Sequence, residues 1–166
     1  FLMNNNKESE FINIIKNNEA AIFKITTFYT NSKDDQEDLY QEIVFQLWKS
    51  FSNFRGDAKI STWLYRIALN TAITYLKKTK KQGDRVSIDH ILLKQMESYD
   101  SLHEDRLRLM YRHINLLNKL EKGLILLLLE GKKYEEIAEI TGLTATNVGT
   151  RISRIKDKLK NQLKTK

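Results

Sequence analysis

The absence of proline is the feature that most limits what this chain of 166 residues can fold into. Proline and glycine interrupt regular structure more than other residues do, and only six glycines are present. The sequence also has no alternation of apolar and polar residues long enough to predict a half-buried strand. Long helices are therefore expected throughout, and the predicted fold class is all-α.

Apolar residues at helical spacing define a first region, residues 1–81. The acidic run Asp34–Asp38 opens its central helix, where negative charge meets the positive end of the helix dipole. Gly56 marks a turn, after which Ser61 or Thr62 is expected to cap a second helix. The aromatic residues expected in the core are Trp48, Phe51 and Phe54.

Residues 82–105 form a polar stretch between two periodic segments and are predicted to be a linker with one short helix near His90–Met96. Helical periodicity returns in residues 106–166, first over Leu107–Leu117 and then over Leu120–Leu129. The prediction is therefore two small helical domains, residues 1–81 and 106–166, joined by a linker.

The net charge of +7 is concentrated near the C-terminus. Residues 151–166 contain seven Lys and Arg and a single acidic residue, Asp157. A basic helix of this kind suits a phosphate backbone or an acidic partner. The simpler interpretation is a charged face in contact with solvent.

Residues 134–160 have the pattern of a helix-turn-helix, a pair of helices joined by a tight turn. Gly142 can adopt the left-handed conformation that ends a helix, and Thr144 can cap the next one. The first helix is expected to bury Ile137, Ala138 and Ile140. The second helix has one narrow apolar stripe, formed by Val148, Ile152, Ile155 and Leu159.

The opposite face of that second helix combines short polar side chains, a glycine and arginines. Small residues allow close approach to base edges, and arginines reach guanine or phosphate. An ordinary helical hairpin is the alternative, but the turn glycine, the spacing and the charge together favour DNA binding. The candidate contacts are Thr146, Asn147, Gly149, Thr150, Arg151, Ser153 and Arg154.

Two segments resemble a known family. DDQEDLYQEIVFQLWKSFSNFRGDAKISTWLYRIALN closely resembles region 2 of bacterial sigma factors of the extracytoplasmic-function (ECF) group, in the sigma-70 family. YEEIAEITGLTATNVGTRISRIKDKL resembles their region 4, and the order and spacing of the regions match as well. The resemblance implies a factor that directs core RNA polymerase to promoters. Region 4 would recognise the −35 element, and region 2 would recognise and melt the −10 element.

The resemblance also implies roles for residues of region 2. Asp38, Gln41 and Glu42 match positions that bind core RNA polymerase, and their spacing places them on one side of a helix. The residues matched to −10 DNA binding are Trp63, Arg66, Asn70, Lys77 and Lys78.

Two of these −10 residues have physical properties that bear on the assigned role. The amide of Asn70 can read a base edge with both a donor and an acceptor, and capture of an extruded base favours strand opening. For Trp63, core packing beside Leu64 and Ile67 is the stronger expectation.

In region 4 the candidate −35 contacts fall on the face already identified from the helical pattern. Gly149 departs from the family pattern, since many relatives have a polar or basic side chain there. The hypothesis is that this glycine permits close approach to DNA while giving up a side-chain contact.

No catalytic pattern is present, and His90, His103 and His113 are too scattered to indicate a metal site. We therefore expect no enzymatic activity, cofactor, metal or small-molecule substrate. The lack of cysteine and the shortness of the longest apolar run, Leu124–Leu129, are compatible with a cytoplasmic protein that joins the nucleoid with polymerase. The expected partners of this monomer are core RNA polymerase and promoter DNA, and an anti-sigma factor is a further candidate.

Two other functions are compatible with parts of the sequence. A stand-alone helix-turn-helix regulator would need a dimer and a palindromic site, and it would leave DLYQE unexplained. A helical adaptor could bind an acidic protein or a membrane surface through its basic C-terminal helix. The narrow stripe of that helix, however, lacks the aromatic residues expected of an interfacial helix.

Overall fold

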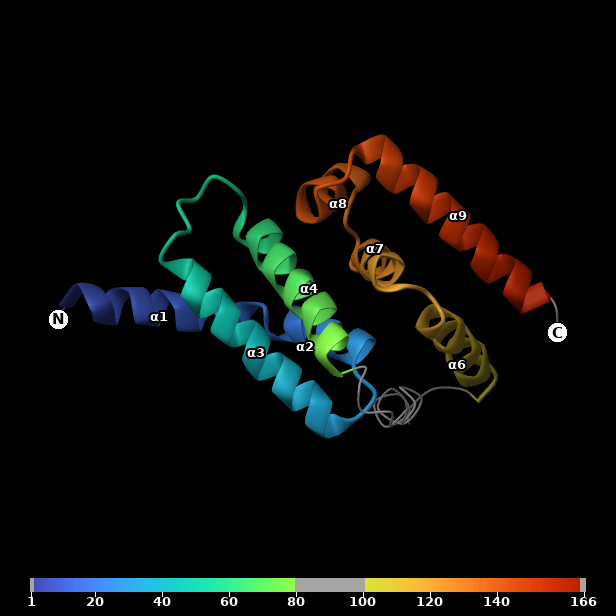
Figure 1. Cartoon of the computed structure of the whole chain (residues 1–166), viewed down its shortest axis with the longest axis horizontal. Helices are drawn as coiled ribbons and strands as arrows, with labels where there is room; N and C mark the ends of the chain where they lie inside the picture. The colour runs from blue at the N-terminus through green and yellow to red at the C-terminus, as the bar shows by residue number, and fades with distance from the viewer. Residues whose placement is uncertain (1, 80–100, 165–166) are drawn as a thin grey trace.

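The structure is a computed structural model that describes residues 2–79 and 101–164. Regular structure within these residues consists of helices alone (Figure 1), which confirms the predicted all-α class. The helices are α1 (Leu2–Asn17), α2 (Glu19–Tyr29), α3 (Lys33–Phe51), α4 (Ile60–Thr79), α6 (Ser101–Asn115), α7 (Lys119–Leu129), α8 (Tyr134–Thr141) and α9 (Ala145–Lys164).

The N-terminal half, residues 2–79, is built around the pairing of α3 with α4, with α2 packed against both. Ser32 caps α3, since its hydroxyl accepts a hydrogen bond from the Asp35 amide at 3.1 Å. Asp34 and Asp35 lie in the first turn, as the acidic run predicted. The turn before α4 contains Gly56 at a φ of 79°, a conformation that favours glycine.

The predicted cap of α4 is wrong. The helix begins at Ile60, and the Trp63 amide already donates to the Lys59 carbonyl at 3.0 Å. Ser61 and Thr62 are therefore inside the first turn rather than ahead of it. A hydroxyl residue near a helix start is a good capping candidate, but the local sequence pattern fixes the first residue of a helix only to within one or two positions.

Trp48 is also not where the sequence predicted it. Its side chain is 43% exposed, and its ring meets the buried Phe11 ring edge to face, with 4.9 Å between centroids. The preceding residue, Leu47, is fully buried instead, and successive helical residues point about 100° apart. Phe51 and Phe54 are half-buried and pack against the core, as expected.

The C-terminal half, residues 101–164, begins inside the segment predicted as linker, because α6 starts at Ser101. The predicted short helix at His90–Met96 lies outside the described residues. Asn118 and Glu121 form a reciprocal capping box at the start of α7. Helix α9 packs against α6, α7 and α8 and so unites this half.

The two halves pack against each other. Helix α4 contacts α7 and α8, and α2 contacts α7 (Figure 1), so that buried side chains of both halves form one continuous core. This packing was not predicted from the sequence, which indicated only two domains and a connection.

Candidate nucleic-acid and polymerase interfaces

The helix-turn-helix formed by α8 and α9 has the local geometry that its sequence predicted. Gly142 ends α8 at a φ of 79°, with its amide donating to the Ala138 carbonyl. Thr144 caps α9, since its hydroxyl accepts a hydrogen bond from the Asn147 amide at 3.1 Å. The turn is therefore stabilised at both ends, and it sets the direction in which α9 leaves α8.

The apolar and polar faces of α9 separate as predicted. Val148, Ile152 and Ile155 are almost fully buried, and Leu159 is half-buried. In α8, Ile137 and Ile140 are buried, and Ala138 is half-buried. The outward face brings together the exposed residues Thr146, Asn147, Thr150, Arg151, Ser153 and Arg154.

This outward face is partly organised before any DNA is bound. Arg151 Nε donates to Asn147 Oδ1 at 2.6 Å, one helical turn away. The hydroxyl of Thr150 donates to the Thr146 carbonyl at 3.0 Å, which leaves its oxygen free to accept. An open hollow of about 520 Å³ lies along the same face, lined by Glu121, Thr144, Thr146, Asn147, Thr150, Arg151, Arg154 and Ile155.

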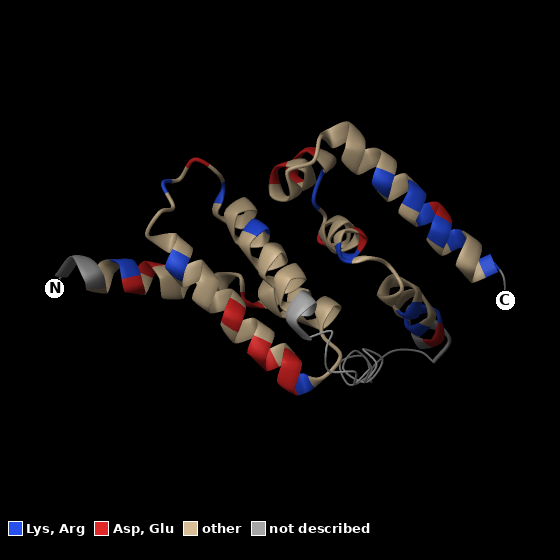
Figure 2. Cartoon of the chain, viewed as in Figure 1, with Lys and Arg blue, Asp and Glu red and all other residues tan. Residues whose placement is uncertain are grey.

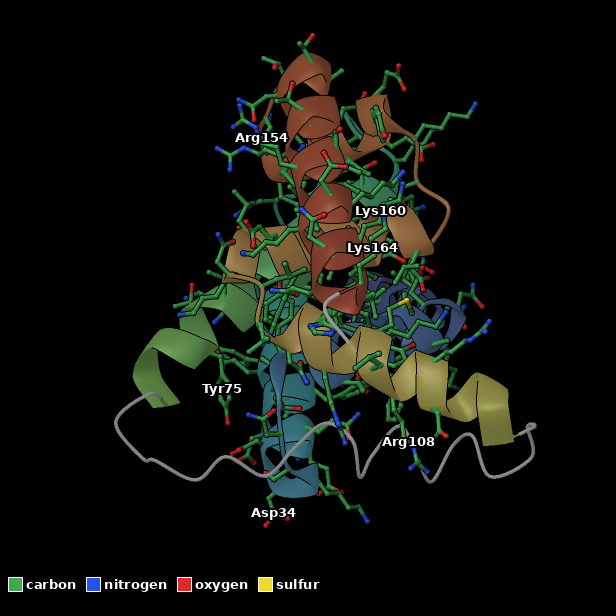
Figure 3. All side chains as sticks on the ribbon, turned by 90° about the vertical axis from the view of Figure 1, so that its right-hand side faces the viewer. Asp34, Tyr75, Arg108, Arg154, Lys160 and Lys164 are labelled. Carbon is green, nitrogen blue, oxygen red and sulfur yellow. The ribbon has the colours of Figure 1, made fainter. Side chains whose placement is uncertain are left out.

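Positive charge follows the same helix. Figure 2 shows Lys and Arg along α9, whereas Asp and Glu gather on the first half of α3. In Figure 3, Arg154 on α9 and Asp34 at the start of α3 lie at opposite ends of the view. The candidate −35 face and the acidic face are thus separate surfaces.

Gly149 lies beside an aromatic ring, a neighbour that the sequence did not indicate. A β-carbon at this position would lie 3.4 Å from Cε2 and 3.5 Å from Cδ2 of Tyr134, the first residue of α8. The Tyr134 ring therefore lies next to the space that a side chain at position 149 would occupy. An alanine would make ordinary van der Waals contact with this ring, and the hypothesis that Gly149 permits close approach to DNA stays a prediction.

Helix α4 places the candidate −10 residues on different sides. Arg66 and Asn70 are exposed, and Thr74 donates to the Asn70 carbonyl at 2.8 Å. The amide side chain of Asn70 is thus open to solvent, as recognition of a base edge requires. The side chains of Lys77 and Lys78 lie outside the described residues.

Trp63 is a core residue in this structure. It is 7% exposed and packs against Phe54 and Phe51, with ring centroids 5.0 and 6.1 Å away. In this conformation the buried ring offers no open face for stacking on a base, and the assignment of Trp63 to −10 DNA binding stays a prediction. The packing beside neighbouring apolar residues, favoured from the sequence, is what the structure shows.

The candidate polymerase-binding residues share one exposed side of α3. Asp38, Gln41 and Glu42 are all exposed, and Gln46 Nε2 donates to Glu42 Oε1 at 2.9 Å. Phe45 lies on the same side and is 56% exposed. Sequence reasoning missed Phe45, although its spacing from Asp38 and Glu42 would have shown that it shares their face.

Tyr75, near the end of α4, is close enough to the carboxylates of α3 to be affected by their negative charge. Partial burial raises its pKa above the ordinary value for tyrosine, and the carboxylates of Asp35 and Asp38 raise it further.

Within the described residues, no group of three or more His, Asp or Glu side chains has the geometry to hold a metal ion. Nor does any helix in this part of the chain have the length and apolar character needed to cross a membrane.

Both halves of the chain are similar to known proteins of one family. Residues 14–82 match the family model described as Sigma-70 region 2, and residues 107–159 match Sigma-70, region 4. The ECF RNA polymerase sigma-E factor of Haemophilus influenzae is 34% identical over 147 residues, which cover 80% of this chain and 76% of that protein. RNA polymerase sigma factor SigV of Bacillus subtilis is 30% identical over 92% of this chain and 90% of its own length.

Two solved structures have a similar fold. CnrH, in complex with the cytosolic domain of CnrY, superposes with a TM-score of 0.71 over 95% of this chain and 90% of its own, at 19% identity. The sigma factor RpoE of Bartonella quintana, in complex with the anti-sigma factor NepR, gives a TM-score of 0.65 over 95% of this chain and 96% of its own, at 20% identity.

Proposed function

This chain belongs to the sigma-70 family of RNA polymerase sigma factors, in the ECF group, and directs core RNA polymerase to promoters; we propose that it does so through three surfaces, on α9, α4 and α3. Regions 2 and 4 correspond to the N-terminal and C-terminal halves described above. Each surface lies on a single helix: α9 binds the −35 element, α4 binds the −10 element, and α3 binds polymerase.

The −35 surface is the exposed face of α9. The observation that carries this proposal is the division of α9 into a buried apolar stripe and an outward face of small hydroxyls, an amide and arginines. A helix held in this way can enter the major groove with its N-terminal residues against base edges. Arg154 and Arg151 then supply donors to guanine or phosphate, while Thr146 and Thr150 contact bases at short range.

The −10 surface is the exposed side of α4, with Asn70 as the residue that reads an extruded base. An exposed amide offers both a donor and an acceptor, which a flipped base can satisfy on its Watson–Crick edge. Arg66 contacts phosphate, and Lys77 and Lys78 are assigned the same role from their place in the sequence.

The polymerase surface is the side of α3 that carries Asp38, Gln41 and Glu42. These residues are exposed, and the acidic groups suit a basic partner helix. Phe45 adds a large aromatic side chain to the same side, and aromatic residues are enriched in the buried cores of protein interfaces. We include Phe45 in this surface for that reason.

The remaining expectations concern partners, activity and compartment. We propose that an anti-sigma factor regulates this protein, as in the RpoE–NepR pair, whose sigma factor has the same fold. We propose further that the chain is monomeric and has no catalytic activity or cofactor of its own. The family acts on transcription, and the chemistry of polymerisation belongs to the polymerase. A cytoplasmic location, with association to the nucleoid through polymerase, follows from the same role.

The −35 assignment can be tested with a matched pair of variants on α9. We expect Arg154→Ala to reduce transcription by the reconstituted holoenzyme from promoters that depend on their −35 element. Lys160→Ala, a basic residue on the same helix outside the proposed face, is the control. Equal losses for both variants would indicate non-specific electrostatics rather than recognition by this face. Failure of the wild-type chain to bind core polymerase would contradict the polymerase surface.

A further inference from the structure

Two polar side chains on the exposed face of α9 hold one another in place before any DNA is present. Arg151 Nε donates to Asn147 Oδ1 at 2.6 Å, and the two residues lie on adjacent turns of the helix. The backbone amide of Asn147 donates to the Thr144 hydroxyl at 3.1 Å, so Asn147 belongs to the capped first turn of α9. The acceptor that directs Arg151 is therefore part of a well-defined helix start.

The contact with Asn147 determines which donors of Arg151 remain for a ligand. A guanidinium has five N–H donors in a rigid fork, and the donor on Nε is the one that Asn147 engages. The donors on Nη1 and Nη2 form the outer edge of the fork, where two parallel N–H groups can bind two neighbouring acceptors. Ordering a long side chain opposes binding, and part of that ordering is already complete in the free protein.

The same contact makes Asn147 a poor reader of adenine. An asparagine reads adenine by accepting from N6 through Oδ1 and donating to N7 through Nδ2. Here Oδ1 already accepts a charge-assisted hydrogen bond, which is stronger than a bond from a neutral amino group. The N6 amino group of adenine would also face the donors of Arg151. The pair thus presents donors to DNA and suits a base edge made of acceptors.

Guanine is the base whose major-groove edge fits a fork of donors. Its N7 and O6 are neighbouring acceptors, whereas adenine pairs one acceptor with a donor. Cytosine presents a donor, and thymine presents one acceptor beside a methyl group. Guanine alone therefore offers two acceptors to the two parallel donors of Arg151.

A phosphate group also carries acceptors, but the hollow along α9 is less suited to one. Arg151 and Arg154 line this hollow together with Glu121 of α7. The Glu121 carboxylate is held there, because Oε2 accepts a hydrogen bond from the Asn118 amide at 3.1 Å. Lys158 Nζ lies 3.7 Å from the same oxygen, but the Lys158 side chain is half-exposed and offsets this charge only in part. A phosphate would face the carboxylate, whereas a base edge has no net charge.

We propose that Arg151 reads one guanine of the −35 element and that Asn147 is the positioning residue that fixes the Arg151 fork for this base. Asn147 acts through Arg151 and does not read a base itself. This assignment rests on the proposed −35 function of α9 and adds the base that one of its residues selects. Promoters of this protein then carry guanine at one −35 position, and adenine there is strongly disfavoured.

Binding of the reconstituted holoenzyme to promoters with each of the four bases at each −35 position tests the proposal. Wild type is expected to prefer guanine over adenine at one position by about tenfold, and Arg151→Ala to lose this preference there alone. Asn147→Ala should reduce the same preference by about threefold, because the fork is no longer ordered in advance. Asn161→Ala, an exposed asparagine near the other end of α9, is the control and should leave the preference unchanged.

Two further variants separate positioning from direct reading. Asn147→Asp keeps an oxygen that accepts from Arg151 Nε, so guanine preference should be retained while the added negative charge weakens binding to every promoter alike. In the Arg151→Ala background, Asn147→Ala should not change base preference further. The preference is a ratio of affinities measured on one preparation, so a variant that folds incompletely still reports it. Preference lost equally in Asn147→Asp and Asn147→Ala would overturn the positioning role.

The remaining outcomes distinguish this assignment from the −35 function on which it rests. If Arg151→Ala weakens binding to all promoters alike and lowers the salt slope by about one, Arg151 contacts a phosphate and the proposal fails. A wild-type protein without guanine preference at any −35 position would overturn it as well. In either case, reduced transcription by Arg154→Ala would leave the −35 surface supported. If no α9 variant, Arg154→Ala included, affects −35-dependent promoters, the −35 surface itself is contradicted.

Discussion

Gly149 illustrates at the scale of one residue how packing changes the meaning of a sequence position. Its backbone lies against the Tyr134 ring, yet a β-carbon there would make only an ordinary contact at 3.4 Å. We expect Gly149→Ala to raise the free energy of unfolding by about 1 kcal/mol through helix propensity. Chemical denaturation of wild type and variant measures this difference. A less stable variant would mean that the Tyr134 ring cannot adjust.

A longer side chain at this position should act differently. Gly149→Arg must extend past the Tyr134 ring, which is 37% exposed and so can move toward solvent. The new guanidinium would then reach the DNA face. We therefore expect an altered −35 preference, or a steeper salt dependence of promoter binding, measured with holoenzyme on promoter variants. A change in thermal stability alone would mean that Gly149 is important for packing only.

Asn70 is the residue whose exposure matters most for strand opening. We expect Asn70→Ala to impair open-complex formation, because the extruded base loses its donor and acceptor, while binding to core polymerase is unchanged. Reactivity of unpaired thymines to permanganate measures opening. Asn13→Ala, an exposed asparagine on α1, is the matched control. Loss of core binding by Asn70→Ala would show that this side of α4 has been misassigned.

At the scale of elements, α3 combines an acidic surface with one exposed aromatic residue. We expect Phe45→Ala to weaken binding to core polymerase by about tenfold, which corresponds to about 1.4 kcal/mol for a buried aromatic contact. Because Phe45 is 56% exposed in the free protein, the thermal midpoint should change little. Ile12→Ala, 44% exposed on α1, is the control. Unchanged affinity for core polymerase would remove Phe45 from this surface.

At the scale of the whole molecule, the contact between the two halves depends on neutral tyrosines, because the Tyr29 hydroxyl donates to the Lys119 carbonyl of α7 and the Tyr65 hydroxyl donates to Glu130. Burial raises the pKa of Tyr29, and burial together with Glu130 raises that of Tyr65. A raised pKa in the packed state means that this stabilisation is complete below the ordinary tyrosine value near 10 and is lost as the pH rises above it. Wild type should therefore lose more stability than Tyr29→Phe between about pH 9 and pH 11.

Thermal unfolding at several pH values measures this difference. The titration of the lysines affects wild type and Tyr29→Phe equally, so its contribution cancels when the two pH profiles are compared. Lys24 also loses its charge at high pH, but it does so in wild type and variant alike. Identical pH profiles would mean that the Tyr29 hydroxyl ionises as easily in the packed protein as in the unfolded chain, which its burial argues against.

Much of this protein follows from its sequence alone, because the signals are local. Helical periodicity predicted an all-α fold, and Gly142 and Thr144 were correctly assigned as the end of one helix and the cap of the next. The buried stripe of α9 and its polar face also follow from residues three or four positions apart. The resemblance to regions 2 and 4 is carried by similarly continuous segments.

Other features were decided only by tertiary structure, because they join residues far apart in the chain. Arg66 bonds to the backbone carbonyl of Glu139, 73 residues away, and a carbonyl has no signature in the sequence. Trp48 is exposed because its neighbour Leu47 takes the core direction on α3. The docking of the two halves likewise depends on how α7 meets α2 and α4 at Gly123, a contact that no single segment specifies.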